Sequence, residues 1–236
     1  MTFDSTTLFP RDFQLQTMMG PNALRILDEL LARAPLPKNA RVLDLGCGMG
    51  LTSMALAKGY GCTVTAADLW VAAEDNARRF AEAGLSERIT AVHCEAHALP
   101  FEAERFDAVV SIDSWHYFAA QSEYPSAHVL PLLKPGGLLL VGIPGLRHAL
   151  DSVPADLRPY WVDGMNFCTL SWWRELWLQC TGLTVRAAFD MRCHKQAWDE
   201  WLESDNEHAK NDVVMMDMEA GRYFATHGLI GEKREW

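Results

Sequence analysis

The sequence contains few basic residues and no basic run longer than the pairs Arg78-Arg79 and Lys233-Arg234. Lysine and arginine total 21 against 31 acidic residues, which gives a net charge of −10 at pH 7. Proteins that bind nucleic acid or an anionic membrane surface cluster lysine and arginine against the phosphates. The charge balance therefore predicts that nucleic acid is not a partner.

Long hydrophobic runs and paired cysteines are also absent. No apolar run approaches the roughly 20 residues of a membrane-spanning helix, so we expect no membrane span. Residues 1–19 include Asp4, Arg11 and Asp12 and lack the apolar stretch of a secretory signal. The six cysteines are scattered without a CxxC pair, which argues against a disulfide framework. These features predict a cytoplasmic protein with reduced thiols.

Strands and helices are predicted to alternate over the first 143 residues. Short apolar runs predict strands at Arg41–Leu45, Thr63–Ala67, Ile89–Cys94, Phe106–Ile112 and Leu138–Ile143. Helical spacing occurs at Pro21–Ala34, with Asn22 as a cap, at Leu51–Lys58, at Val71–Ala83 and in a segment ending at Val129–Leu133. This alternation is typical of βαβ units and a parallel sheet.

The pattern is weaker after Pro144. A helix is predicted at Ser171–Cys180 with Ser171 as its N-cap, and an acidic helical segment at Ala197–Gly221. Strands are predicted at Leu183–Phe189 and Tyr223–Gly231. This half is rich in tryptophan: Trp161, Trp172, Trp173, Trp177, Trp198 and Trp201. We expect most of them to cover the sheet, and Trp161 to lie in a lid.

The strongest motif is the segment Val42–Gly50, VLDLGCGMG, where a predicted strand runs into a glycine turn that opens a helix. Glycines let a ligand approach main-chain N–H groups closely. The spacing is GxGxG, whereas dinucleotide sites usually have GxGxxG, whose third glycine falls here on Leu51.

A second signal is Asp68, at the end of the second predicted strand and 22 residues after Gly46. This offset favours a carboxylate that accepts hydrogen bonds from both ribose hydroxyls of an adenosine cofactor. The alternative is a helix N-cap, because a helical stretch follows Asp68.

Together with the later segments HCEAHALPF, FDAVVSIDSWHYF and LLKPGG, residues 41–143 resemble the class I, Rossmann-like S-adenosylmethionine-dependent methyltransferases. Within that class the chain is most similar to small-molecule enzymes, including those with generic or cyclopropane-fatty-acid-synthase-like names. The resemblance implies S-adenosyl-L-methionine as cofactor and methyl transfer to a small-molecule acceptor.

The resemblance also implies a set of cofactor-binding residues. The methionine part would be held by Asp44, Gly46, Gly48 and Gly50. The ribose would be held by Asp68, with Leu69 and Trp70 beside the adenine. The adenine edge would meet Glu95, Ala96 and His97, and Asp113 would complete the set at the end of the fourth strand. Glu95 departs from the family pattern, in which aspartate is common at that position.

The implied fold is α/β, a doubly wound three-layer α/β/α sandwich with a seven-stranded, mostly parallel sheet, an antiparallel last strand and cap elements. We expect a single methyltransferase domain over residues 1–236. Residues 1–37 would form N-terminal cap helices, residues 38–143 the cofactor-binding core, and residues 144–236 the substrate-cap insertions and the last two strands. The segments Met1–Gly20, Gly145–Leu170 and His194–Gly221 would gather above the strand ends.

His116 and Tyr117 follow the fourth predicted strand and are the candidate catalytic residues. Ligands of doubly wound sheets bind outside the carboxyl ends of the strands, so these side chains would face the acceptor. His116 would then serve as a general base. Packing of the aromatic cluster against the next helix is an equally good interpretation.

No metal site is predicted. His93 and Cys94 are neighbours in a strand and would point to opposite faces, and no other ligands have workable spacing. Two other functions share some of these sequence features. Leu51 and the LKPGG turn argue against an NAD-dependent dehydrogenase. A non-catalytic S-adenosylmethionine-binding regulatory module would carry the same loops.

Overall fold

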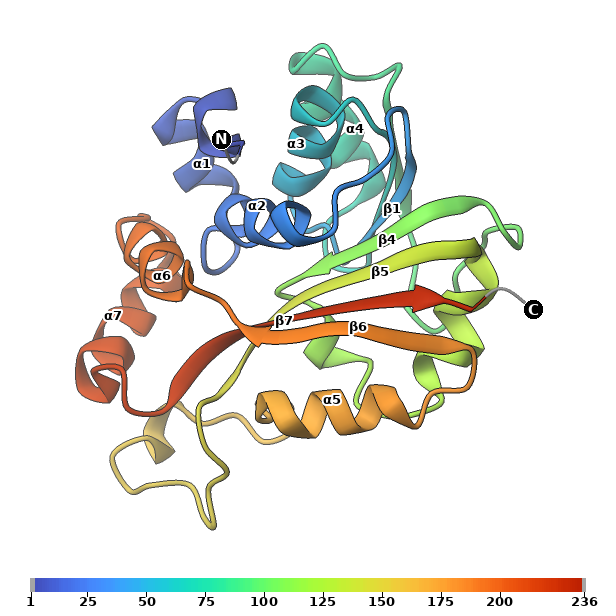
Figure 1. Ribbon diagram of the computed structural model, residues 1–236. Helices are drawn as coiled ribbons and strands as arrows, with labels where there is room; N and C mark the ends of the chain where they lie inside the picture. Colours follow the sequence, from blue (N-terminus) through green and yellow to red (C-terminus); the bar gives the residue numbers. More distant parts are fainter. Residues whose placement is uncertain (1–2, 235–236) are drawn as a thin grey trace.

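The computed structural model describes residues 3–234, and these contain one seven-stranded sheet in the order β3-β2-β1-β4-β5-β7-β6 (Figure 1). The strands are β1 (Arg41–Leu45), β2 (Thr63–Asp68), β3 (Ile89–His93), β4 (Phe106–Ile112), β5 (Leu133–Leu146), β6 (Leu183–Asp190) and β7 (Phe224–Lys233). Only β7 is reversed: it pairs antiparallel with both β5 and β6, while the other pairs are parallel. The expected mostly parallel sheet with an antiparallel last strand is confirmed.

Helices cover both faces of this sheet. The α-helices of the described residues, including those outside the layers, are α1 (Arg11–Thr17), α2 (Ala23–Arg33), α3 (Leu51–Gly59), α4 (Ala73–Glu82), α5 (Leu170–Leu178), α6 (His194–Leu202) and α7 (Glu207–Glu219). Figure 1 shows α2 and α3 above the sheet and α5 below it. The three-layer α/β/α arrangement expected from the sequence is therefore confirmed.

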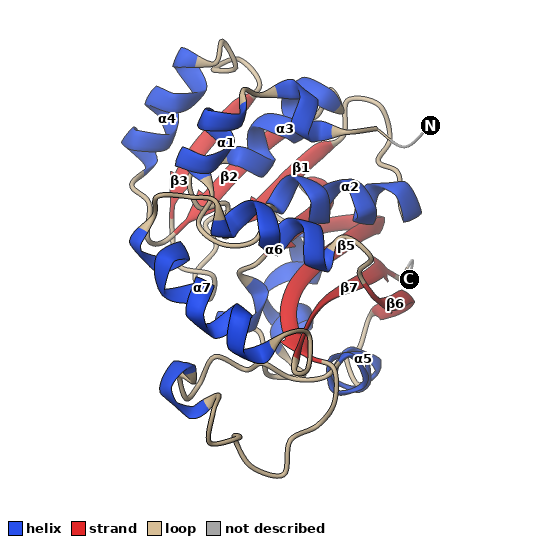
Figure 2. Cartoon of the chain, turned by 90° about the vertical axis from the view of Figure 1, so that its left-hand side faces the viewer, coloured by secondary structure: helices blue, strands red, loops and turns tan. Residues whose placement is uncertain are grey.

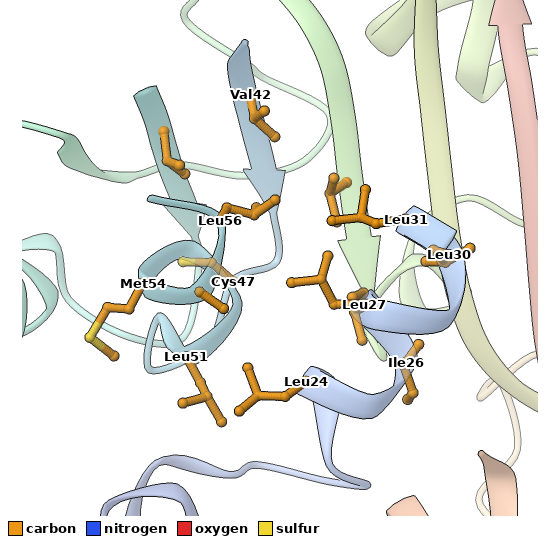
Figure 3. Close-up of a cluster of buried hydrophobic side chains, with 14 of the residues drawn as sticks. Leu24, Ile26, Leu27, Leu30, Leu31, Val42, Cys47, Leu51, Met54 and Leu56 are labelled. Carbon is orange, nitrogen blue, oxygen red and sulfur yellow. The ribbon is translucent and has the colours of Figure 1, made fainter. Parts of the chain in front are cut away.

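Two hydrophobic clusters form the core, one on each face of the sheet. On one face Val42 belongs to the same cluster as Leu27 of α2 and Leu56 of α3 (Figure 3). On the other face Leu43 packs with Trp177 of α5. Neighbouring strand residues point to opposite faces, and here both faces are covered. This explains why the strands are continuously apolar instead of alternating.

Helix ends follow local capping chemistry, with two corrections to the sequence prediction. The Asn22 side chain accepts a hydrogen bond from the Leu24 amide at 3.0 Å and caps α2, as predicted. Helix α5 is capped by Thr169, whose hydroxyl accepts from the Trp172 amide, so the predicted cap Ser171 is wrong. Thr169 has the extended backbone of an N-cap, whereas Ser171 already lies inside the helix.

The acidic segment predicted as one helix is two, α6 and α7. They are separated at residues 203–206, where Asn206 caps α7 by accepting from the His208 amide at 2.9 Å. The segment before β5 also differs. It forms a π-helix at Pro125–Val129 and a 3-10 turn at Leu130–Leu132, because Pro131 has no N–H to continue a regular helix.

The elements that do not belong to the three layers gather at one end of the sheet. Helices α1, α6 and α7 and the loop of residues 147–169 lie at the left of Figure 1, where β5 ends and β7 begins. Figure 2 shows α6 beside α2, with α7 continuing from it. We call these elements the cap. Strand β5 is parallel to β4 and ends here, whereas the antiparallel β7 begins here. This is therefore the end at which the parallel strands terminate.

Within residues 3–234, no helix combines the length and the apolar character needed to cross a membrane.

Candidate functional site

Two adjoining cavities lie at the carboxyl ends of β1, β2 and β4. The first, of about 100 Å³, is bounded by the glycine loop after β1, by residues 17–23 and by residues 112–117. The second, of about 370 Å³, is bounded by the residues that follow β2, β3 and β4. Both are lined by the same five residues: Gly46, Asp68, Trp70, Ser114 and Tyr117. The two cavities therefore form one continuous region at the position where doubly wound sheets bind ligands.

The glycine loop requires glycine for both conformational and steric reasons. Gly46 and Gly50 have φ angles of 73° and 81°, in the left-handed region. A Cβ on Gly46 would lie 2.4 Å from the Ser114 side chain, and one on Gly50 would lie 2.5 Å from the Phe80 ring. Gly46 faces the cavities directly, whereas Gly50 lies behind the loop as the residue before α3.

Asp68 binds the glycine loop with its own side chain. One carboxylate oxygen accepts from the Gly48 amide at 2.7 Å, and the other accepts from the Trp70 and Val71 amides at 2.7 and 2.9 Å. Asp68 does not cap α4, which begins at Ala73 after Ala72. A carboxylate has about four acceptor positions, so one remains for a ligand in the cavities.

Asp44 lies behind the loop and lines neither cavity. Its Oδ2 accepts from the Thr52 and Ser53 hydroxyls, both at 2.6 Å, while Oδ1 is buried and has no partner among the described residues. Burial raises the pKa of this carboxyl to about 6. Asp44 thereby connects the end of β1 to the start of α3, and Oδ1 is available to a donor that reaches beneath the loop.

The second cavity has an aromatic and apolar wall. Leu69 and Trp70 are exposed beside it, and Glu95, Ala96 and His97 approach it from the loop after β3. The Trp70 and Tyr117 rings meet edge to face, with centroids 4.9 Å apart. Flat apolar surfaces with a few polar groups at the rim are typical of pockets for planar ligands.

The structure brings most of the predicted site residues together. All of them line at least one cavity except Asp44, Gly50 and His116. The sequence predicted that Met1–Gly20 gathers above the strand ends, but it did not predict that Met18–Pro21, between α1 and α2, forms one wall of the first cavity. Its only local signal is the chain-breaking Gly20-Pro21 pair, because its position depends on contacts with distant residues.

His116 differs from the catalytic expectation. Its side chain is 1% exposed, lines neither cavity and packs on Phe167 of the cap with ring centroids 5.7 Å apart. Its Nδ1 has no partner among the described residues, and burial lowers its pKa to about 3. This geometry favours packing, the other interpretation of the motif, over a general base.

Tyr117 and Asp113 do face the first cavity. Asp113 follows β4 with a φ of 55°, and its amide donates to the Gly142 carbonyl at 2.7 Å. Burial and the Asp212 carboxyl raise the pKa of Asp113 to about 8. Burial, with the same two carboxyls nearby, raises the pKa of Tyr117 to about 12. Both groups are therefore weak acids at the wall of the cavity.

Metal ligands are not grouped in the part of the chain that the structure describes: no three histidine, cysteine or acidic side chains are placed to hold an ion. His93 places its Nε2 2.8 Å from the Leu69 carbonyl oxygen.

Comparison with known proteins finds a methyltransferase-like segment in this chain. A profile for a family described as "Methyltransferase domain" matches residues 42–137. The methyltransferase GfsG of Streptomyces halstedii is 31% identical over 153 residues, covering 64% of this chain and 52% of that protein. The chain spans about half the length of the curated relatives that it matches first.

Two solved structures extend the likeness over nearly the whole fold. Phosphoethanolamine N-methyltransferase 2 of Haemonchus contortus, in complex with S-adenosyl-L-methionine, has a TM-score of 0.75 at 20% identity, covering 98% of this chain and 57% of that one. The [4+2]-cyclase SpnF has a TM-score of 0.72 at 20% identity, covering 98% and 95%. Residues 42–137 therefore match a methyltransferase domain, and the chain shares the overall fold of these two structures.

Proposed function

We propose that the protein binds S-adenosyl-L-methionine in the paired cavities and transfers its methyl group to a small-molecule acceptor. The observation that carries this proposal is the pair of adjoining cavities that share Gly46 and Asp68. A ligand with a nucleoside part and an amino-acid part would occupy both at once, with Asp68 at their junction.

The residues present fit this cofactor. The larger cavity, with Leu69, Trp70 and the residues after β3, suits the adenosine part. The smaller cavity suits the methionine part, because Gly46 exposes backbone there and leaves no room for a side chain. Asp68 has one acceptor position for a ribose hydroxyl, and the unpartnered Oδ1 of Asp44 lies beneath the same loop.

The bound cofactor would supply a methyl group on a positively charged sulfur, a reactive leaving group that needs no further activation. The chain's own residues then have to bind the acceptor, align it and exclude water. Tyr117 and Trp70 stand at the junction of the cavities, and Met18 and Met19 form an apolar wall opposite the glycine loop.

A small molecule is the proposed acceptor because the first cavity, which would receive the methionine part and the reacting end of the cofactor, is narrow and is closed by the segment between α1 and α2. Its walls come from residues 17–23, the glycine loop and the residues after β4. A compact molecule fits such a pocket, whereas a polymer would be obstructed. The net charge of −10 supports the same choice.

Calorimetric titration with S-adenosyl-L-methionine, S-adenosylhomocysteine and NAD tests the cofactor. We expect both sulfur compounds to bind and NAD not to bind. Release of S-adenosylhomocysteine in a screen of thiols, amines, carboxylates and hydroxylated metabolites tests the reaction. Binding without any turnover would favour a regulatory module. Methylation of bulk RNA or protein, with no small molecule methylated, would contradict the closed pocket.

A further inference from the structure

The segment between α1 and α2 forms one wall of the first cavity. We call residues 18–22 the strap, and four of its five residues line this cavity. The Gly20 backbone lies so close to the Asp113 carboxyl that a Cβ on Gly20 would collide with Oδ2. The Met19 sulfur lies beside the glycine loop, 2.9 Å from where a Cβ on Gly48 would be. The strap therefore faces the glycine loop across the space proposed for the methionine part.

The strap is not hydrogen-bonded to the loops that it faces. Among the described residues, no hydrogen bond joins residues 18–22 to the glycine loop or to residues 112–117. Its long-range hydrogen bonds run to α6 instead: the Asn22 amide donates to the Ala197 carbonyl at 2.9 Å, and Asn22 Nδ2 donates to Glu200 Oε2 at 2.6 Å. The strap is thus held from the cap side, by a helix 178 positions away in the sequence.

Glu200 is the centre of the contacts between α6 and the strap region. While Oε2 accepts from Asn22, Oε1 accepts from the Arg25 guanidinium of α2 at 3.0 Å. Arg11 of α1 places a guanidinium nitrogen 3.8 Å from Oε2. The Glu200 side chain is only 12% exposed, and hydrogen bonds to a charged group are about twice as strong as neutral ones. One carboxylate therefore connects α1, the end of the strap and α2.

A second hydrogen bond holds the chain before the strap. The Ser204 hydroxyl, just after α6, donates to the Leu15 carbonyl of α1 at 3.0 Å, and Ser204 is buried. Figure 2 shows α6 lying beside α2. The chain is consequently fastened to α6 and its end on both sides of the strap, at Leu15 and at Asn22.

We propose that Glu200 is a positioning residue for the cofactor, which holds the strap where the methionine part fits between it and the glycine loop. This rests on the proposed function, because it concerns the same cavities. Glu200 lines neither cavity, so it acts through Asn22 and the strap. A site that is held in its binding shape before the ligand arrives loses less conformational freedom on binding, which raises affinity.

Two ligands distinguish this role from a general effect on stability. S-adenosylhomocysteine has the amino-acid part that would lie under the strap, whereas 5′-methylthioadenosine has the same nucleoside and sulfur without it. In calorimetric titrations, Glu200→Ala should weaken binding of S-adenosylhomocysteine by about 10- to 100-fold and of 5′-methylthioadenosine by less than about 3-fold. Unchanged affinity for S-adenosylhomocysteine, or equal weakening of both ligands, would contradict the proposal.

Three further variants complete this test. Glu200→Gln keeps the shape and an acceptor for Asn22 but loses the charge that faces Arg25, so it should fold and lie between wild type and Glu200→Ala. Ser204→Ala removes the other hydrogen bond and should weaken S-adenosylhomocysteine by about 2- to 10-fold. Asp199→Asn is the matched control on the same helix, because Asp199 is exposed and pairs with Lys195 at the surface. It should bind both ligands like wild type.

Hydrogen exchange of the protein without ligand tests the strap directly. The peptide of residues 15–22 should exchange at least about 10-fold faster in Glu200→Ala than in wild type, while the peptide containing β1 should be unchanged. Equal exchange of residues 15–22 in the two proteins would show that Glu200 does not hold the strap.

The two levels of the proposal fail separately. If wild type does not bind S-adenosylhomocysteine, the proposed function fails. If wild type binds it and the Glu200 variants bind it equally well, only the positioning role of Glu200 fails.

Discussion

The sheet with its glycine loop and the cap that covers it are built in different ways. Around β1, β2 and β4 the contacts arise from strand pairing and from helices adjacent in sequence, and side chains such as Val42, Leu43 and Val109 are fully buried. The cap is held largely by contacts between distant segments. Arg25 of α2 binds Glu200 of α6 at 3.0 Å, and the Asn166 amide donates to the His116 carbonyl at 2.8 Å.

This difference separates the two halves of the proposed site. The glycine loop and Asp68 belong to the regular core, since they follow the paired strands β1 and β2. Met18 and Met19 belong to the segment between α1 and α2, which is not part of the sheet. Most residues that line the two cavities therefore come from the ends of core strands, and one wall of the first cavity comes from residues 17–23.

The largest effect should come from truncating a core tryptophan. Trp177 of α5 is fully buried against the sheet, so Trp177→Ala should lower the free energy of unfolding by about 3–5 kcal/mol. Trp161 in the cap is only partly buried, and Trp161→Ala should cost about 1 kcal/mol. Denaturant titration measures both. Equal losses would remove the distinction between core and cap.

Trp177→Phe is the control for the first variant. The Trp177 indole N–H has no partner among the described residues. The phenylalanine ring therefore loses some packing contacts but no hydrogen bond. It should recover most of the stability lost in Trp177→Ala.

A methyl group in the glycine loop should have the next largest effect. Gly46→Ala combines a left-handed backbone, costing about 1–2 kcal/mol, with a collision against Ser114 that adds about 1–3 kcal/mol. Gly61→Ala is the matched control, since Gly61 has a φ of 69° but nothing within 4 Å of the added carbon. Thermal unfolding of both variants should show the larger loss for Gly46→Ala. Similar losses would mean that the loop can shift to admit a side chain.

Asp68→Ala tests the junction of the two cavities. Losing its hydrogen bonds should weaken S-adenosyl-L-methionine binding by about 2–3 kcal/mol, roughly 30- to 150-fold. Calorimetry on the folded variant measures this, with Asp75→Ala of α4 as an exposed acidic control. Unchanged affinity in folded Asp68→Ala would rule out the ribose role.

The buried His116 predicts a pH dependence of stability. Its folded pKa is about 3, below the ordinary value of 6.5, so the folded state resists protonation while the unfolded chain accepts the proton. Stability is therefore lost as the pH falls below 6.5. Between pH 7 and pH 5 the wild type should lose about 2 kcal/mol more than His116→Phe, measured by denaturant titration. Parallel curves for the two proteins would show that His116 is accessible to protons.

The smallest expected effect is that of a chelator. With no grouped ligands among residues 3–234, treatment with EDTA should leave the melting temperature and cofactor affinity unchanged in core and cap alike. A large drop in either would reveal a metal that the described side chains do not suggest.

Sequence patterns alone determined the core and its glycine loop. The bounds of β1 and β4 were predicted to the residue, and those of α3 and β2 within one residue. The reason is that the spacing of apolar residues within a short segment indicates a buried strand or helix. The glycine loop was predictable because a left-handed turn and a close approach of backbone both demand glycine locally.

The tertiary structure decided the acceptor side of the site. No local pattern distinguishes a tyrosine that faces a cavity from a histidine that is buried beside it, yet Tyr117 and His116 differ in this way. Met18–Pro21 reaches this region from outside the sheet, and its own sequence does not encode that position. The periodicity of apolar residues indicates which face of a helix or strand is buried. Which other element covers that face is determined only by the packing of the whole chain.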